Sequence, residues 1–232
     1  MPEPRFIYRT FKNMQIPRDP TKVVPGTFYH GIVHGSYYGW YAEEMIKRNL
    51  GQGNPIVLAS PNYAAYLSPD YAAHHVRIRD QDIEDLRSRG QRQGGITPRA
   101  IERLNNVPDQ IELEFEVGRR RISPESPSRL ECLYVADNRD TIRQMFSDDT
   151  NLIILKASII EALRSRKADY KWCEIYYDEK NPQYIENYWR SLPYDNGVNN
   201  WEYLVDGLIM VDDPDGLRTL RTLWSEEGPG DD

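Results

Sequence analysis

Three short apolar runs, far apart in the sequence, constrain the fold more than any other feature of this chain. They are Phe-Tyr-His-Gly at 28–31, Leu-Tyr-Val-Ala-Asp at 133–137 and Trp-Glu-Tyr-Leu-Val at 201–205. Each run has the length and the aromatic or β-branched content of a β-strand, and each places one polar side chain within it. A His, a Tyr and a Glu on three separate strands can converge on one cleft.

The composition indicates a globular chain whose core depends on aromatic residues. The 232 residues, 39% of them hydrophobic and 28% charged, suit one domain or one domain with a sizeable insertion. Mean hydropathy is low, at −0.72, so 16 tyrosines and 5 tryptophans must supply much of the buried area. A net charge of −7 and a pI near 5.2 give no overall attraction to nucleic acid.

Strands and short helices are mixed along the chain without the regular alternation of a doubly wound sheet. Apolar and alternating runs predict strands at 27–33, 55–59, 76–78, 111–117, 132–136, 152–157, 172–177 and 201–211. Helical spacing and capping residues predict helices at 41–50, 80–89, from 97 onward, and at 137–146, 182–189 and 214–224. The sequence therefore predicts an α+β fold.

The ends of the chain differ in composition from its centre. Residues 1–26 are polar and contain five prolines, which predicts an extended arm, and 27–224 are expected to form one domain before an acidic, disordered tail at 225–232. Neither a signal peptide nor a run of about 18 apolar residues is visible, so a cytoplasmic location is expected, as it would be for a protein delivered into a host or target cell. Cys132 and Cys173 lie in apolar runs and are predicted to be buried free thiols.

The three apolar runs resemble the NAD-binding motifs of the ADP-ribosyltransferases, in the branch of diphtheria toxin and the poly(ADP-ribose) polymerases. His30-Gly31 is similar to that family's first-strand motif, Tyr134 to the Tyr of its Tyr-Phe-Ala-Asp stretch, and Glu202 to the Glu of its Glu-Tyr-Ile-Val stretch. The motifs occur in the family's order and span residues 28–205. The resemblance implies a split, strongly bent β core flanked by short helices.

The same resemblance implies an NAD-dependent mono-ADP-ribosyltransferase, with NAD as substrate and no metal. His30 would donate a ring N–H to the NAD ribose, and Gly31 would let the backbone approach the nicotinamide amide. Tyr134 would stack on nicotinamide, with Ala136 in the same binding set. Glu202 would be the catalytic carboxylate that stabilises an oxocarbenium-like transition state, in a catalytic triad with His30 and Tyr134.

The second aromatic face of the nicotinamide site departs from the family pattern. In the polymerases the helix after the Tyr strand carries a Ser and then a second Tyr, and here Ile142 and Met145 fall at those positions. Phe146, one residue further on, could supply the second aromatic ring. Other aromatic candidates are Tyr37, Tyr38 and Tyr63.

Other groups of acidic, histidine and basic residues give less specific predictions of functional sites. Residues 112–116 contain the Glu-x-Glu pattern of another transferase branch, but they precede the Tyr strand and are interpreted as the acidic face of a strand. The adjacent histidines 74–75 would point to opposite faces of a strand and could not chelate one ion well, and His34 could line the cleft. The basic clusters at 87–92 and 119–121 could hold the NAD pyrophosphate or remain solvated.

Several functions stay open beside mono-ADP-ribosyl transfer. An NAD glycohydrolase or an NAD-dependent RNA phosphotransferase could use the same fold. A non-catalytic interaction or inhibitor protein could use the tyrosine-rich loop 60–71 as its binding surface. For a transferase, the acidic balance favours a protein acceptor over nucleic acid, and no membrane partner is expected. Residues 124–205, with Ser128-Arg129 and Tyr188-Trp189, also resemble a bacterial and phage family of uncharacterised transferase-like proteins.

Overall fold

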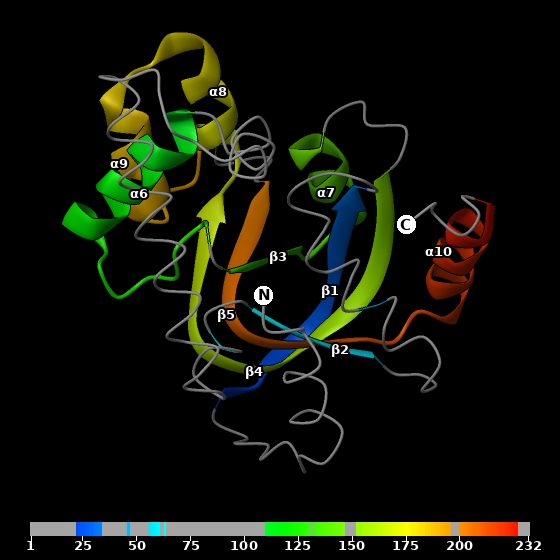
Figure 1. Ribbon diagram of the computed structural model, residues 1–232. Helices are drawn as coiled ribbons and strands as arrows, with labels where there is room; N and C mark the ends of the chain where they lie inside the picture. The colour runs from blue at the N-terminus through cyan, green and yellow to red at the C-terminus, as the bar shows by residue number, and fades with distance from the viewer. Residues whose placement is uncertain are drawn as a thin grey trace, which may run out of the picture.

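The computed structural model (Figure 1) describes residues 22–33, 46, 56–60, 63, 110–130, 132–146, 152–195 and 200–226. Its elements are β1 (Val24–Val33), β2 (Ile56–Ala59), α6 (Gln110–Ile122), β3 (Leu133–Ala136), α7 (Arg139–Met145), β4 (Leu152–Asp169), α8 (Lys171–Glu179), α9 (Pro182–Trp189), β5 (Trp201–Val211) and α10 (Pro214–Glu226). Several predictions concern residues outside the described ranges. Among predicted elements these are most of the arm, the strand 76–78, the helices 80–89 and from 97, the helix 41–50 except Ile46, the loop 60–71 except Ser60 and Tyr63, and the tail beyond 226. Among candidate site residues they are His34, the histidines 74–75, Tyr37, Tyr38 and the basic cluster 87–92.

The five strands form one antiparallel sheet in the order β2-β5-β3-β1-β4, and with the helices they make an α+β fold. Strand β4 is long and bent, as Figure 1 shows. Its residues 152–159 pair with β1, while its residues 157–169 pair with β5. Because β1 also pairs with β3, and β3 with β5, the four strands form a closed circuit of pairings.

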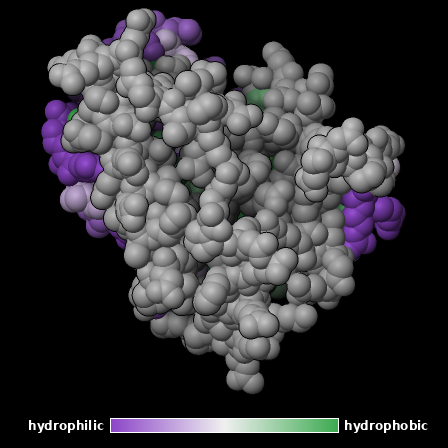
Figure 2. Space-filling view, in the orientation of Figure 1, coloured by the Kyte–Doolittle hydropathy of each residue, from purple (hydrophilic) through white to green (hydrophobic). Residues whose placement is uncertain are grey.

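The larger hydrophobic core lies on one face of these strands. Phe28, Val135 and Val205 contribute to it from β1, β3 and β5. Helix α10 packs on β4 and adds Leu217 and Leu220 to the same core. The outer side of α10 is hydrophilic and forms the purple region at the right of Figure 2, so this helix is amphipathic.

Helices α6, α8 and α9 lie together in Figure 1 and form a second layer. Their apolar residues pack with Leu204 of β5 into a separate core that includes Phe115, Tyr176 and Trp189. The indole Nε1 of Trp189 donates a 2.7 Å hydrogen bond to the carbonyl oxygen of Phe115, which ties α9 to α6. The face of β3 and β5 opposite to the larger core is therefore covered by helices, and both faces of these strands are buried.

The prediction of a strand at 111–117 is wrong, since these residues belong to α6. Alternation over seven residues also places residues four apart on one side, and in a helix those residues share a face. Ile111 and Phe115 form the apolar face of α6, while Glu112 and Glu116 are buried beside it with arginine partners. Glutamate has a high helix propensity, and the arginines remove the cost of burying it.

The remaining predicted elements that lie within the described residues are largely confirmed. The exception is the strand at 172–177, which is part of α8, where Cys173 and Tyr176 are three residues apart and share the buried face. Strand β4 runs twelve residues beyond the predicted 152–157, and β1 begins at Val24 inside the predicted arm. Helix α6 continues through the basic cluster at 119–121 as far as Ile122. Both cysteines are free and buried, as predicted. Within the described part of the chain, each helix is too short or too polar to cross a membrane.

Candidate active site

The three motif strands are neighbours in the sheet, with β3 between β1 and β5. Ala136 of β3 pairs with Tyr29 on one side and with Glu202 on the other. Tyr134 pairs with Leu204 of β5. Since directly opposed residues of antiparallel strands share a face, the side chains of Tyr134, Ala136 and Glu202 lie on the face covered by the helical layer. Strand alternation places His30 on the opposite face, so the side chains of His30, Tyr134 and Glu202 do not lie on one face, contrary to the expectation that they converge on one cleft.

His30 nevertheless meets the Tyr strand, through that strand's backbone. Strands β1 and β3 are in register only at Tyr29 and Ala136, and beyond that pair the Nδ1 atom of His30 lies 2.7 Å from the carbonyl oxygen of Tyr134. A carbonyl oxygen only accepts, so Nδ1 carries the hydrogen and Nε2 of the neutral ring is an acceptor. Burial lowers the pKa of His30, although the bond to Tyr134 opposes the shift.

The free nitrogen of His30 changes the role expected for this residue. Nε2 is buried and has no hydrogen-bond partner among the described residues. The ring N–H that was expected to reach a ribose is used by Tyr134. His30 can therefore accept a hydrogen bond from a ligand hydroxyl through Nε2, and it cannot donate one there while it is neutral.

Gly31 lies against the helix that follows the Tyr strand. A Cβ atom at this position would be 2.6 Å from the ring of Phe146 and 2.7 Å from Cγ2 of Ile142. Helix α7 is fixed here by its N-cap Asn138, whose side chain accepts a 2.8 Å hydrogen bond from the backbone N–H of Thr141. The structure thus brings Phe146, the predicted second aromatic residue, to the glycine predicted to receive nicotinamide.

Glu202 has no exposed surface. Its Oε1 atom accepts hydrogen bonds from Arg129 Nη1 at 2.6 Å and from the Tyr188 hydroxyl at 2.5 Å. Its Oε2 atom is buried and has no partner among the described residues. Burial raises the pKa of Glu202, and Glu112 adds to the shift, while Arg129 and Tyr188 oppose it. Arg129 does not serve Glu202 alone, because it is shared with a second carboxylate.

That second carboxylate is Glu112. Arg129 donates from Nε and Nη2 to the two carboxylate oxygens of Glu112 at 2.8 and 2.9 Å, in the bidentate geometry of a strong ion pair. The guanidinium also lies 5.1 to 5.6 Å from the ring centroids of Phe115, Tyr134 and Tyr188. Burial alone would lower the pKa of Arg129, but Glu112 and Glu202 raise it well above its ordinary value. Arg129 is therefore a permanently protonated guanidinium, enclosed by Glu112 and three aromatic rings, beside Glu202.

Arg129 and Tyr188 are the site residues that the sequence prediction missed. Both belong to the stretches that resemble a transferase-like family, a resemblance that implies no role for them. Their contacts with Glu202 cross 73 and 14 residues of sequence. Only the resemblance of the two dipeptides that contain them could have indicated these residues. A lone arginine before a strand and an aromatic residue in a helix form no local pattern that predicts an ion pair.

The basic cluster at 119–121 does not lie with the motif residues. Arg119 and Arg120 both bind Glu116 of the same helix, at 2.8 and 2.9 Å, and Arg119 also donates to the carbonyl oxygens of Pro124 and Ser126. These bonds fix the turn after α6. In the structure, this cluster stabilises the end of a helix.

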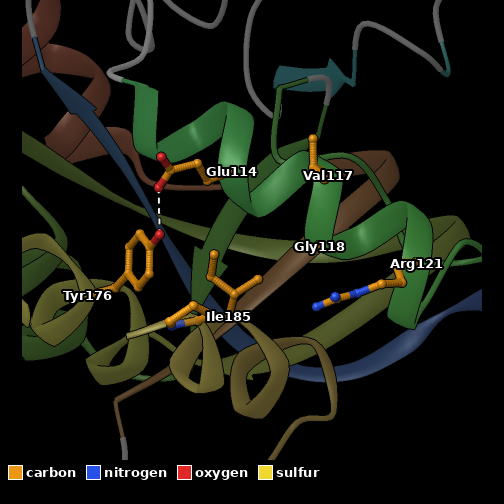
Figure 3. Close-up of a pocket in the computed structure, with 7 residues that line it drawn as sticks. Glu114, Val117, Gly118, Arg121, Tyr176 and Ile185 are labelled. Atoms are coloured by element: carbon orange, nitrogen blue, oxygen red, sulfur yellow. Dashed lines mark hydrogen bonds between the residues drawn. The ribbon is translucent and has the colours of Figure 1, made fainter. Parts of the chain in front are cut away.

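One hollow among the described residues lies between α6 and the pair α8 and α9, away from the three motif strands (Figure 3). Its lining residues are Glu114, Val117, Gly118, Arg121, Tyr176, Pro182 and Ile185. The Tyr176 hydroxyl donates a 2.6 Å hydrogen bond to Glu114 across it. Its walls are packed helix faces, and its polar groups do not converge on a common point. Among the described residues, no group of three His, Cys, Asp or Glu side chains is placed to hold a metal ion.

Comparison with known families identifies the chain by sequence. Residues 32–215 match the model of the family described as "Protein of unknown function (DUF2441)", and the chain belongs to this family. The match begins two residues after His30 and includes Tyr134, Arg129, Tyr188 and Glu202. No curated protein matches the chain.

Proposed function

We propose that this member of the DUF2441 family transfers ADP-ribose from NAD⁺ to a macromolecular acceptor and releases nicotinamide, on an ADP-ribosyltransferase-like fold. The observation that carries the proposal is the register of β1, β3 and β5. Three motifs separated by more than 60 residues each meet at Ala136, which pairs with Tyr29, the residue before His30, and with Glu202. Their order is the one that the resemblance to ADP-ribosyltransferases requires.

The unpartnered polar atoms support a ribose-binding role. Nε2 of His30 is a buried acceptor, and Oε2 of Glu202 is a buried carboxylate oxygen, both without a hydrogen-bond partner among the described residues. Buried polar atoms are almost always hydrogen-bonded, so each of these two atoms can accept a hydrogen bond from a ligand. Ribose hydroxyls are donors of the required kind. Oε2 of Glu202 would meet them on the face of Tyr134, while Nε2 of His30 lies on the opposite face of the sheet.

The aromatic residues support a nicotinamide slot. In the register of the two strands, Gly31 comes level with Tyr134 on the same face, at the point where β1 has left β3. The Phe146 ring lies on the side of this glycine to which a Cβ would point. A planar ring could stack between Tyr134 and Phe146 once the Phe146 ring, which now fills the space against Gly31, turns aside. NAD⁺ binding would then require a small local rearrangement of α7.

The chemistry needs few groups. The bond between ribose C1′ and the nicotinamide nitrogen breaks, and its electron pair leaves with nicotinamide. A nucleophilic oxygen or nitrogen of the acceptor then bonds to C1′ and releases its proton to water. Glu202 would stabilise the positive charge that develops on the ribose, because a carboxylate in a buried site interacts strongly with that charge.

The test is nicotinamide release from NAD⁺ by wild-type protein, Glu202→Gln and Glu161→Gln, with and without a cell lysate. Glu161 of β4 is a matched control, because it is also a buried carboxylate with an unpartnered oxygen but lies outside the three motifs. We expect release by the wild type and by Glu161→Gln, increased by lysate, and a loss of at least about 100-fold in Glu202→Gln. Equal rates for the wild type and Glu202→Gln would refute the role of Glu202.

One observation favours a second function. Glu202 is fully buried and ion-paired, which is also what a purely structural carboxylate would show. In a non-catalytic interaction protein, the wild type would release no nicotinamide, and NAD⁺ would not change its melting temperature. Release without transfer of label to lysate protein would instead indicate an NAD glycohydrolase.

A further inference from the structure

Glu202 is held through only one of its carboxylate oxygens. Oε1 accepts from both Arg129 and Tyr188, while Oε2 lacks a partner among the described residues although it is fully buried. The position of Oε2 is therefore set by what binds Oε1. The residue that fixes Oε1 also decides where Oε2 meets a ligand.

Arg129 is fixed from the side opposite to Glu202. Two of its nitrogens are bound by Glu112, and three aromatic rings surround its guanidinium. The side chain is 95% buried. A planar guanidinium with its fork occupied has little freedom to rotate, so Nη1 presents a rigid donor to Glu202.

The charges around Glu202 do not balance. Among the described residues, the titratable groups on this side of the sheet are Glu112 of α6, Arg129 of the turn before β3, Cys132 and Tyr134 at β3, Arg166 of β4, Tyr170 and Cys173 at α8, and Tyr188 of α9. Burial raises the pKa values of both cysteines, Tyr170 and Tyr188, which keeps these groups neutral. Within the bonded group of Arg129, Glu112 and Glu202, one guanidinium thus binds two carboxylates, and one negative charge is left over when both are ionised.

We propose that Arg129 is the positioning residue of this site, and that Glu112, by sharing its charge, leaves Glu202 with a negative charge that only a cationic reaction centre balances. This inference rests on the proposed function. An Arg–Glu pair without Glu112 would be neutral and would interact weakly with a developing oxocarbenium ion. With Glu112 present, the buried excess charge favours the transition state over neutral groups in the ground state.

The pair Glu112→Gln and Glu116→Gln tests this. Both residues are buried on α6 one turn apart, and both bind arginine, but Glu116 binds Arg119 and Arg120 and makes no bond to Arg129. The ionisation of Glu202 is followed by carboxyl ¹³C NMR, with Glu202→Gln identifying its signal. The pH dependence of nicotinamide release is followed in parallel.

We expect Glu112→Gln to lower the titration midpoint of Glu202 by on the order of one pH unit, because Arg129 then serves Glu202 alone. The acidic side of the pH profile of kcat should move to lower pH by the same amount as the Glu202 midpoint. The value of kcat should fall about tenfold, with KM changed less than about threefold. Glu116→Gln should leave the midpoint and the pH profile unchanged. A purely structural role for Glu112 would lower the melting temperature of both variants without moving either readout.

The two readouts separate the two proposals. An unchanged midpoint in Glu112→Gln overturns the role of Arg129, whether or not the protein cleaves NAD⁺. A shifted midpoint in a protein that releases no nicotinamide would refute the proposed function, while the control of Glu202 ionisation by Arg129 would stand.

Discussion

At the scale of single residues, burial decides what the candidate site residues can do. His30 is neutral because burial lowers its pKa, and its one hydrogen is committed to a backbone carbonyl. Glu202 holds one oxygen towards Arg129 and leaves the other without a partner among the described residues. Both residues therefore offer acceptors and no donors, which matches a ligand rich in hydroxyl groups.

His30 should make the stability of the protein depend on pH in the weakly acidic range. Its pKa in the folded protein lies below the ordinary value of 6.5, so the unfolded chain binds a proton first as the pH falls. The stability is thus complete above about pH 6.5 and is lost as the pH falls towards the folded pKa, by at most about 1.4 kcal/mol per pH unit. Urea unfolding of wild type and His30→Gln between pH 5 and 8 measures the difference. Parallel curves for the two proteins would contradict the assignment.

The sequence was informative where a residue lies in a short motif. His30, Tyr134 and Glu202 could be proposed because each is the polar member of a strand-like run. The binding partners of Arg129 could not be predicted, since they lie 17, 59 and 73 residues away along the chain. The burial of Glu202 depends on α6 and α9, which come from other parts of the sequence, and no pattern around residue 202 reports it.

At the scale of elements, α6 shows how an alternating pattern misleads. The run from Ile111 to Val117 has period two, but its glutamates form ion pairs that a helix brings together. Glu112 and Glu116 are four residues apart and both meet arginines on one side of α6. Elements with a mainly apolar pattern, such as β5, and helices with clear caps, such as α9 with Asn181 and Pro182, were predicted correctly.

Helix α6 also approaches α9 at a glycine. A Cβ atom at Gly118 would lie 2.2 Å from Cγ2 of Ile185. Gly118→Ala should therefore lower the free energy of unfolding by about 1–3 kcal/mol, even though alanine favours an isolated helix by about 1 kcal/mol. Val117→Ala, at a position 69% exposed on the same turn, should change it by less than about 0.5 kcal/mol. Urea denaturation compares them, and a Gly118→Ala variant as stable as the wild type would show that the two helices can separate freely.

At the scale of the whole molecule, the sheet and the helical layer meet at Glu202. The closed circuit of β1, β3, β5 and β4 surrounds one core, and α6, α8 and α9 enclose a second. Arg129 joins the two parts because it binds Glu112 of α6 and Glu202 of β5. The α+β class was predictable from the mixture of elements, but this closure was not, because it depends on the second half of β4, beyond the predicted strand.

The most direct test of this account is the affinity for NAD⁺, measured by titration calorimetry on wild type, Gly31→Ala and Gly216→Ala. The two substitutions are matched, because a Cβ would lie 2.6 Å from Phe146 in the first and 2.6 Å from Leu155 of the core in the second. The account predicts that the wild type and Gly216→Ala bind NAD⁺ with similar affinity, and that Gly31→Ala loses at least about tenfold, or about 1.4 kcal/mol. Equal binding by all three proteins, or no binding by the wild type, would contradict an NAD site at the junction of β1 and β3.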